Sequence, residues 1–285
     1  MMSNPRSKQS AGVMLAFLAL AVLVTIYTAG GKGSIGWSVP ASKKPDVQMS
    51  SATGEDMEKL WNWADGELGG GSRAASWHLR WSVEGVTSDQ AAKTAEALGM
   101  TADAKDLAGG KDENKTSGGI LWEAVRTTAN GTLKMQLLGT VQKNRDAARQ
   151  AVMTYHAPPA AELQAILNEM IEVNAALTET GTGGKRMMSI KLYGKAIRVG
   201  AAGRIAQKAA GVVLDEYKDS RTIVRTYSST AVAGAMRLGE GKEGSRSANI
   251  QLAEHGGGDA DFAAEITVGI PLITGDLSES GAEGT

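Results

Sequence analysis

The stretch RMMSIKLYGKAI, residues 186–197, decides the fold because a similar stretch occurs once more, earlier in the chain. Apolar and polar residues alternate along it: Met188, Ile190 and Leu192 form one row, and Ser189, Lys191 and Tyr193 form the other. This alternation predicts a β-strand with one buried and one exposed face. About 110 residues earlier, SWHLRWSVEGVTS at 76–88 alternates in the same way, and a helix-like segment follows each stretch. The sequence therefore predicts a structural unit that occurs twice.

The segments around these two strands complete each unit. In the first half, 120–139 predicts a hairpin that turns at Asn130-Gly131, because both positions tolerate positive φ. A helix is expected at 56–71; it either covers the main domain or rests on a membrane or a partner through Trp61 and Trp63. Three more helices are expected: one after the capping pair Thr87 and Gln90, a long one that begins at Pro158 and Pro159, and one at about 203–217. Further strands are expected at 147–156, 222–229, 231–238, 247–253 and 265–273. Each half thus predicts a strand, a helix and several antiparallel strands. The expected fold is α+β, with a duplicated unit forming a curved antiparallel sheet that has helices on one face.

A charge-free apolar segment near the N-terminus predicts a membrane location. Residues 11–29 contain no charge and no proline, and as a helix they would rise roughly 28 Å, close to the thickness of the bilayer core. Arg6 and Lys8 precede the segment, which places residues 1–10 in the cytoplasm and the rest of the chain outside. The segment is either a transmembrane signal anchor or a signal peptide cleaved near Thr28 and Gly30. The protein is then a single-pass cell-membrane protein with an extracellular domain, or it is secreted.

The expected domain organisation follows from composition and from a family resemblance. Residues 30–51 predict a flexible linker, and 278–285 an acidic tail. The stretches SWHLRWSVEGVTS, SANIQLAEHGGG (247–258) and EITVGIPLITGDL (265–277) resemble the YwmB-like family of Firmicutes over about 76–277. The resemblance implies an extracytoplasmic domain at 52–277 with the saddle fold of the TATA-box-binding protein, in two repeats at about 76–180 and 186–275. It implies no catalytic residues.

Composition and motifs argue against several functions. The chain has no cysteine, and beyond Arg6 and Lys8 it carries 28 basic and 31 acidic residues. A DNA-binding saddle needs a basic concave surface, so no DNA partner is expected. Gly239, Gly241 and Gly244 match the spacing of a dinucleotide-binding motif, but a strand rather than a helix is expected after them. The stretch ETGTGGKRM (179–187) resembles half of a phosphate-binding loop, but it joins a helix to a strand rather than a strand to a helix, so it is interpreted as a helix stop. His78, His156 and His255 lack ligand spacing, and Asp259 with Asp261 is an incomplete calcium motif. No cofactor, metal or catalytic residue is predicted.

The exposed face of the sheet remains as the candidate site. By parity with the buried rows it should present His78, Arg80, Lys134, Gln136, Lys191, Tyr193, Asn249 and Gln251, of which Arg80, Lys134, Gln136, Lys191, Tyr193 and Gln251 are the predicted binding residues. One interpretation is a solvated face without a ligand. The other is a non-enzymatic binding face for an anionic envelope polymer, a peptide or a partner protein. Nucleic-acid binding by fold analogy and an uncharacterised envelope enzyme are the alternative functions.

Overall fold

The computed structural model describes residues 49–103, 119–139, 149–182, 184–238, 246–256 and 264–272, all within one compact unit at 45–285. The predicted membrane segment at 11–29, residues 30–48 of the predicted linker and the predicted tail at 278–285 lie outside the described residues. Within those residues, no helix is both long enough and apolar enough to cross a bilayer.

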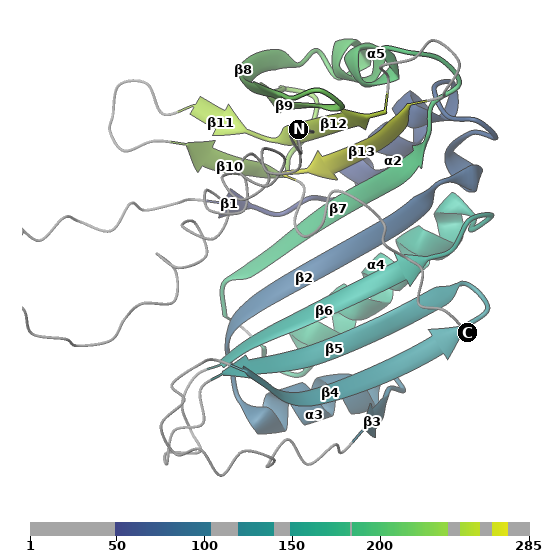
Figure 1. Ribbon diagram of the computed structural model, residues 1–285. Coiled ribbons are helices and arrows are strands. Elements are labelled where there is room, and N and C mark those ends of the chain that lie inside the picture. The colour runs from purple at the N-terminus through teal and green to yellow at the C-terminus, as the bar shows by residue number, and fades with distance from the viewer. Residues whose placement is uncertain are drawn as a thin grey trace, which may run out of the picture. The chain divides into compact units, whose positions relative to one another are not determined.

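The main sheet has ten antiparallel strands in the order β3-β4-β5-β6-β2-β7-β13-β12-β9-β8 (Figure 1). Their bounds are β2 Ser76–Val86, β3 Thr101–Asp103, β4 Gly119–Thr128, β5 Gly131–Gly139, β6 Arg149–Ala157, β7 Arg186–Lys195, β8 Val212–Lys218, β9 Thr222–Ser228, β12 Ile250–His255 and β13 Glu265–Ile270. The order outward from the central pair is the same on both sides: β2-β6-β5-β4-β3 on one and β7-β13-β12-β9-β8 on the other. The two stretches that predicted a duplicated unit are therefore neighbours at the centre of the sheet.

Four α-helices and a small second sheet complete the described part of the chain. The helices are α2 Gly54–Asp65, α3 Ser88–Ala97, α4 Leu163–Glu179 and α5 Ala201–Lys208, with a short 3-10 helix at Ser72–Ala74. Figure 1 shows α3 and α4 behind the strands of the first half. The small sheet has the order β1-β10-β11, with β1 Met49–Ser50, β10 Ala235–Leu238 and β11 Arg246–Ala248. The expected α+β class with a large antiparallel sheet is confirmed.

The predicted apolar rows form the core between the sheet and the helices. Trp77, Leu79, Trp81 and Val83 of β2 and Met188, Ile190 and Leu192 of β7 are all buried. The ring of Trp61, on α2, stacks on Trp77 with centroids 5.2 Å apart. The helix around Trp61 therefore covers the core, which was one of the two roles expected of it. The capping pair Thr87 and Gln90 is also confirmed, because each side chain binds the other residue's backbone N–H at the start of α3.

Several predicted element bounds are wrong. The helix expected to reach residue 217 ends at Lys208, because Ala210 adopts a φ of 50° and the segment that begins with the β-branched Val212 and Val213 forms β8. The long helix begins at Leu163 rather than at the prolines, since Ala160 has a φ of 74° and its N–H donates to the Arg73 carbonyl. Helix α2 ends at Asp65, and β13 ends at Ile270, directly before Pro271.

The two strands expected at 231–238 and 247–253 are also altered. Strand β10 begins only at Ala235, because the N–H groups of Ala233 and Gly234 donate to Asp56 instead of to a neighbouring strand. The second is divided into β11 and β12 at Asn249, whose side chain binds the backbone of Ser229. Both changes depend on side chains that bind backbone groups far away in the sequence.

The predicted hairpin forms, but its turn is Ala129-Asn130 rather than Asn130-Gly131, because Gly131 already pairs with Thr128 as the first residue of β5. A buried tyrosine binds this turn and contributes to alkaline stability. Tyr155 is 1% exposed and donates from Oη to the Asn130 carbonyl at 2.6 Å. Burial, and to a lesser extent the charge of Glu169, raises the pKa of Tyr155 to about 12. The unfolded chain loses this proton near pH 10, the folded chain near pH 12, so ionisation favours unfolding between these values.

We expect the free energy of unfolding to fall with pH above about 10, and this residue to contribute a loss of about 2–3 kcal/mol by pH 12. In Tyr155→Phe that contribution is absent, so the difference in stability between the two proteins should shrink as the pH rises. Urea unfolding at a series of alkaline pH values measures it, with Tyr217→Phe, which removes a 47% exposed tyrosine, as control. A pH-independent difference would contradict the assignment.

Candidate functional site

The strand register brings the predicted binding residues to one face of the main sheet. Arg80 of β2 lies opposite Thr154 of β6 and Ser189 of β7. In the next row, His78 lies between His156 and Lys191. We call this side of the sheet the polar face. Lys134, Gln136, Tyr193 and Gln251 share it, because each is an even number of positions along its strand from a residue in these two rows.

Arg80 is at the centre of the polar face and has the clearest binding character. Its strand is one of the two central strands, and its side chain is half-buried. Among the described residues it forms no ion pair, and burial alone lowers the pKa of its guanidinium. A guanidinium remains charged in proteins and offers five N–H donors in a planar fork. A half-buried guanidinium of this kind favours a ligand that brings negatively charged oxygen atoms.

Two histidine rings lie beside Arg80. The imidazoles of His78 and His156 stack with centroids 4.3 Å apart and planes inclined by 10°. Their residues form a direct cross-strand pair, and Lys191 continues the row on β7. His78 is among the residues predicted for this face, and His156 is not. The signal was present, because His156 is two positions from Thr154 and so shares its face, but only the register shows that the two rings meet.

Lys134 and Gln136 are on the predicted face but contribute less positive charge than expected. The Glu123 Oε2 atom of β4 is 2.9 Å from Lys134 Nζ and accepts a hydrogen bond from Gln136 Nε2 at 2.8 Å. The charge of Lys134 is therefore balanced within the sheet. Glu123 is not among the predicted residues, because only the hairpin register places it directly opposite Gln136.

The second half supplies Tyr193 and Gln251 but not Asn249. Tyr193 and Gln251 are half-buried, and Gln251 Nε2 is 3.4 Å from Thr226 Oγ1 in the neighbouring strand. Asn249 is 3% exposed, and its side chain accepts from the Ser229 N–H at 2.7 Å and donates to the Ser229 carbonyl. The prediction that Asn249 faces outward is wrong, because its amide satisfies a loop backbone.

The centre of the polar face carries cationic and neutral side chains. On the four central strands its residues are Val152, Thr154 and His156, then Ser76, His78, Arg80 and Ser82, then Met187, Ser189, Lys191 and Tyr193, and finally Thr267 and Gly269. None of these is a carboxylate. Acidic side chains of the face, among them Glu84, Glu123 and Glu265, lie toward its margins. The arrangement can therefore hold an anion by charge and by hydrogen bonds from donors on several strands.

Within the described residues, no group of three or more histidine, cysteine, aspartate or glutamate side chains could hold a metal ion. Asp259, Asp261 and the GEGKEG glycines lie outside the described residues. Neither a model of a known protein family nor a curated protein matches this chain. The resemblance to the YwmB-like family therefore stays a prediction.

Proposed function

We propose that this chain is a non-enzymatic binding domain on the outside of a Gram-positive cell membrane, tethered through residues 11–29 or secreted if that segment is cleaved. Its ligand is an anionic component of the cell envelope, either a polymer or the acidic surface of a partner protein. The centre of the polar face, with Arg80, His78, His156 and Lys191, binds it.

The observation that carries this proposal is the state of Arg80. Burying a cation is costly unless an anion accompanies it, and a carboxylate within the fold usually supplies that anion. The guanidinium of Arg80 is half-buried and has no such partner in the described part of the chain. Lys191 and the two histidines add donors in the adjacent row. An anionic ligand across these rows would supply the missing negative charge.

Two sequence features support the location, and one structural feature supports the finer fold. The apolar segment at 11–29 with its preceding cations favours export. The identical strand order on both sides of the central pair is what a pseudo-twofold saddle of the TATA-box-binding-protein kind requires. We infer that fold without its DNA-binding activity, because the chain beyond residue 30 has more acidic than basic residues.

The test uses poly(glycerol phosphate) as an anionic polymer and dextran as an uncharged one. We expect the purified full chain to bind the phosphate polymer and not dextran, with an affinity that falls as salt rises. Arg80→Glu together with Lys191→Glu should lower that affinity at least about tenfold, because each reversal replaces an attraction by a repulsion. Fluorescence anisotropy of end-labelled polymer measures it.

The matched control is Lys93→Glu, a charge reversal on helix α3, where the side chain is 62% exposed and pairs with Asp89. It changes the net charge by the same amount per residue as either site substitution. A loss of binding free energy per reversed charge equal to that of the double variant would mean that total charge, not the polar face, controls binding. The ligand would be a protein if the wild type did not bind the polymer, and if a partner protein were crosslinked to the wild type but not to the double variant.

A further inference from the structure

The loop between β7 and α5 presents two large apolar side chains to solvent. Ile197 is 60% exposed and Val199 is 59% exposed, and they are separated by one residue, the exposed Arg198. Among the described residues, only two other large hydrophobic side chains, Ile171 and Val212, are as exposed as these. Isolated exposed apolar residues are ordinary, but two within three residues at the tip of one loop form a small protruding apolar surface.

The loop is held rigidly, so this exposure is built into the fold. The Ile197 N–H donates to the Glu67 carbonyl at 2.9 Å, and the Gly200 N–H donates to the Glu254 carboxylate at 2.9 Å. The Arg204 guanidinium donates to the carbonyls of Val199 and Arg198 at 2.9 and 3.3 Å. Contacts before, within and after the tip therefore fix the backbone in the conformation that points both side chains outward.

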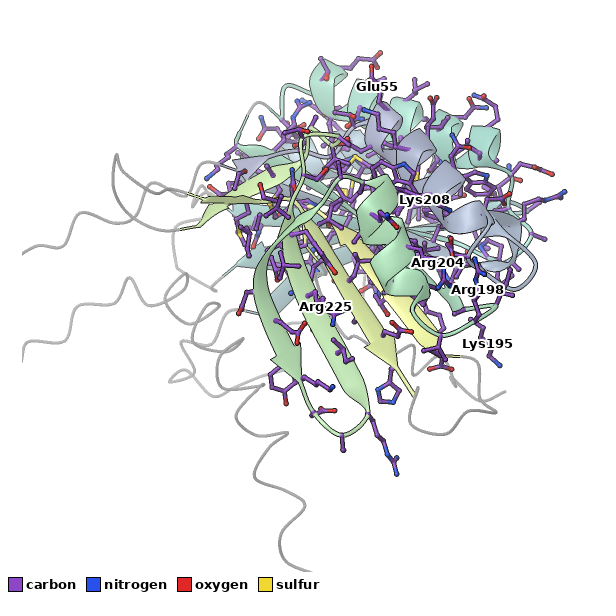
Figure 2. The ribbon with its side chains drawn as sticks, turned by 90° about the horizontal axis from the view of Figure 1, so that it is seen from above. Glu55, Lys195, Arg198, Arg204, Lys208 and Arg225 are labelled. Atoms are coloured by element: carbon purple, nitrogen blue, oxygen red, sulfur yellow. The ribbon has the colours of Figure 1, made fainter. Side chains whose placement is uncertain are left out.

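A row of cations includes Arg198, between the two apolar residues of the tip. Figure 2 shows Lys208, Arg204, Arg198 and Lys195 in succession from α5 to the end of β7. Arg198 and Lys195 are exposed and form no ion pair among the described residues. Among the described residues, three carboxylates contact or lie opposite this segment: Glu67, Glu254 and Glu265. Glu67 is buried beneath Arg204 and Lys208, with Nε and Nζ at 2.6 and 3.1 Å from its oxygens, and Glu265 is half-buried opposite Lys195.

Burial alone would raise the pKa of Glu67, but its hydrogen bonds to Arg204 and Lys208 outweigh this effect and lower the pKa. Glu67 is therefore ionised at neutral pH and neutralises part of the charge on α5. Because this carboxylate is buried, the surface that an approaching partner meets is formed by the exposed cations Lys195 and Arg198 and by the apolar tip between and beside them.

We infer that the β7–α5 loop docks the domain onto an anionic lipid bilayer. Ile197 and Val199 would enter the interface, and Lys195 and Arg198 would contact phosphate headgroups, since apolar side chains flanked by cations bind such surfaces. This inference rests on the proposed tether. The tether would allow it, because 19 residues at 30–48 can span up to about 65 Å, and β7 is about 33 Å long. Because Ser51 binds the Arg186 carbonyl at the start of β7, the tether is long enough for the loop at the other end of β7 to reach the membrane.

The absence of cysteine makes a site-specific test possible. The full chain carrying Ile197→Cys is labelled with a nitrobenzoxadiazole dye and reconstituted into vesicles of phosphatidylcholine with phosphatidylglycerol, or of phosphatidylcholine alone. We expect nitroxide-labelled lipids to quench the dye in the anionic vesicles and much less in the neutral ones. The control is Ile171→Cys on α4, an apolar side chain that is 66% exposed away from the loop, where little quenching is expected.

A second variant tests the role of the cations. The labelled chain also receives Lys195→Gln and Arg198→Gln. In anionic vesicles, we expect these changes to lower the ratio of docked to undocked label, as measured by quenching, at least about tenfold. If the chain floats with the vesicles but the label at 197 is quenched no more than at 171, the docking inference is wrong and the tether stands. If the chain does not float with vesicles at all, both are wrong. Equal quenching in neutral and anionic vesicles would also contradict the inference.

Discussion

Gly184→Ala should lower the free energy of unfolding by at least about 3 kcal/mol, and in the extreme prevent folding. A Cβ atom built on Gly184 would lie 1.7 Å from the carbonyl oxygen of Glu84, and no real contact of this kind is that short. The obstacle is backbone, so a side-chain rotation cannot relieve it. Glu84 N–H also donates to the Lys185 carbonyl at 3.1 Å, which holds the end of β2 against the start of β7.

The consequence of Gly184→Ala is therefore a separation of the two central strands at one end. Urea unfolding followed by tryptophan fluorescence measures the loss, because Trp77 and Trp81 are buried on β2. Gly203→Ala is the matched control: it lies in α5 with no atom within 4 Å of the added Cβ, and it should be neutral or stabilising by up to about 1 kcal/mol. A wild-type midpoint for Gly184→Ala would contradict the close approach. The same contact gives Gly184 a structural role within ETGTGGKRM, the stretch that joins α4 to β7.

Asp56→Ala should destabilise the fold by about 3–5 kcal/mol. Asp56 is 0% exposed, and its carboxylate accepts three backbone N–H groups. Oδ2 accepts from Thr53 and Gly234, each at 3.0 Å, and Oδ1 accepts from Ala233 at 2.8 Å. It therefore completes the capping box of α2 and fixes the loop before β10. The alanine variant would leave these donors without their carboxylate partner in the interior.

Asp56→Asn separates the charge from the shape of this side chain. Its single carbonyl oxygen can accept at one side only, so we expect an intermediate loss. The control is Glu55→Ala, one residue earlier, where the side chain is 84% exposed and 3.8 Å from Lys59, and the change should stay within about 0.5 kcal/mol. Thermal unfolding of the four proteins at neutral pH compares them. Equal stability of Asp56→Ala and Glu55→Ala would show that the buried carboxylate does not hold the loop.

The two predictions depend on contacts that join positions far apart in the sequence, and sequence analysis did not find them. What it did find is local. The alternation along β2 and β7 identified the buried rows and the polar face, since side-chain direction within a strand is set by backbone geometry. The capping pair at Thr87 and the hairpin of β4 and β5 are also local features, although the turn of that hairpin lies one residue earlier than predicted. The prediction of a helix up to residue 217 is wrong because residues 212–218 pair with β9 and form strand β8.

By itself, the sequence determined the class of the fold, the two equivalent stretches at its centre and the face on which Arg80, Lys191, Tyr193 and Gln251 lie. Only the tertiary structure decided which of that face's charges are balanced: it placed Glu123 against Lys134, His156 against His78, and no carboxylate against Arg80 within the described residues. The physical reason is register. Periodicity assigns a side chain to a face, but the residue across from it comes from another strand, and strand pairing depends on the packing of the whole core.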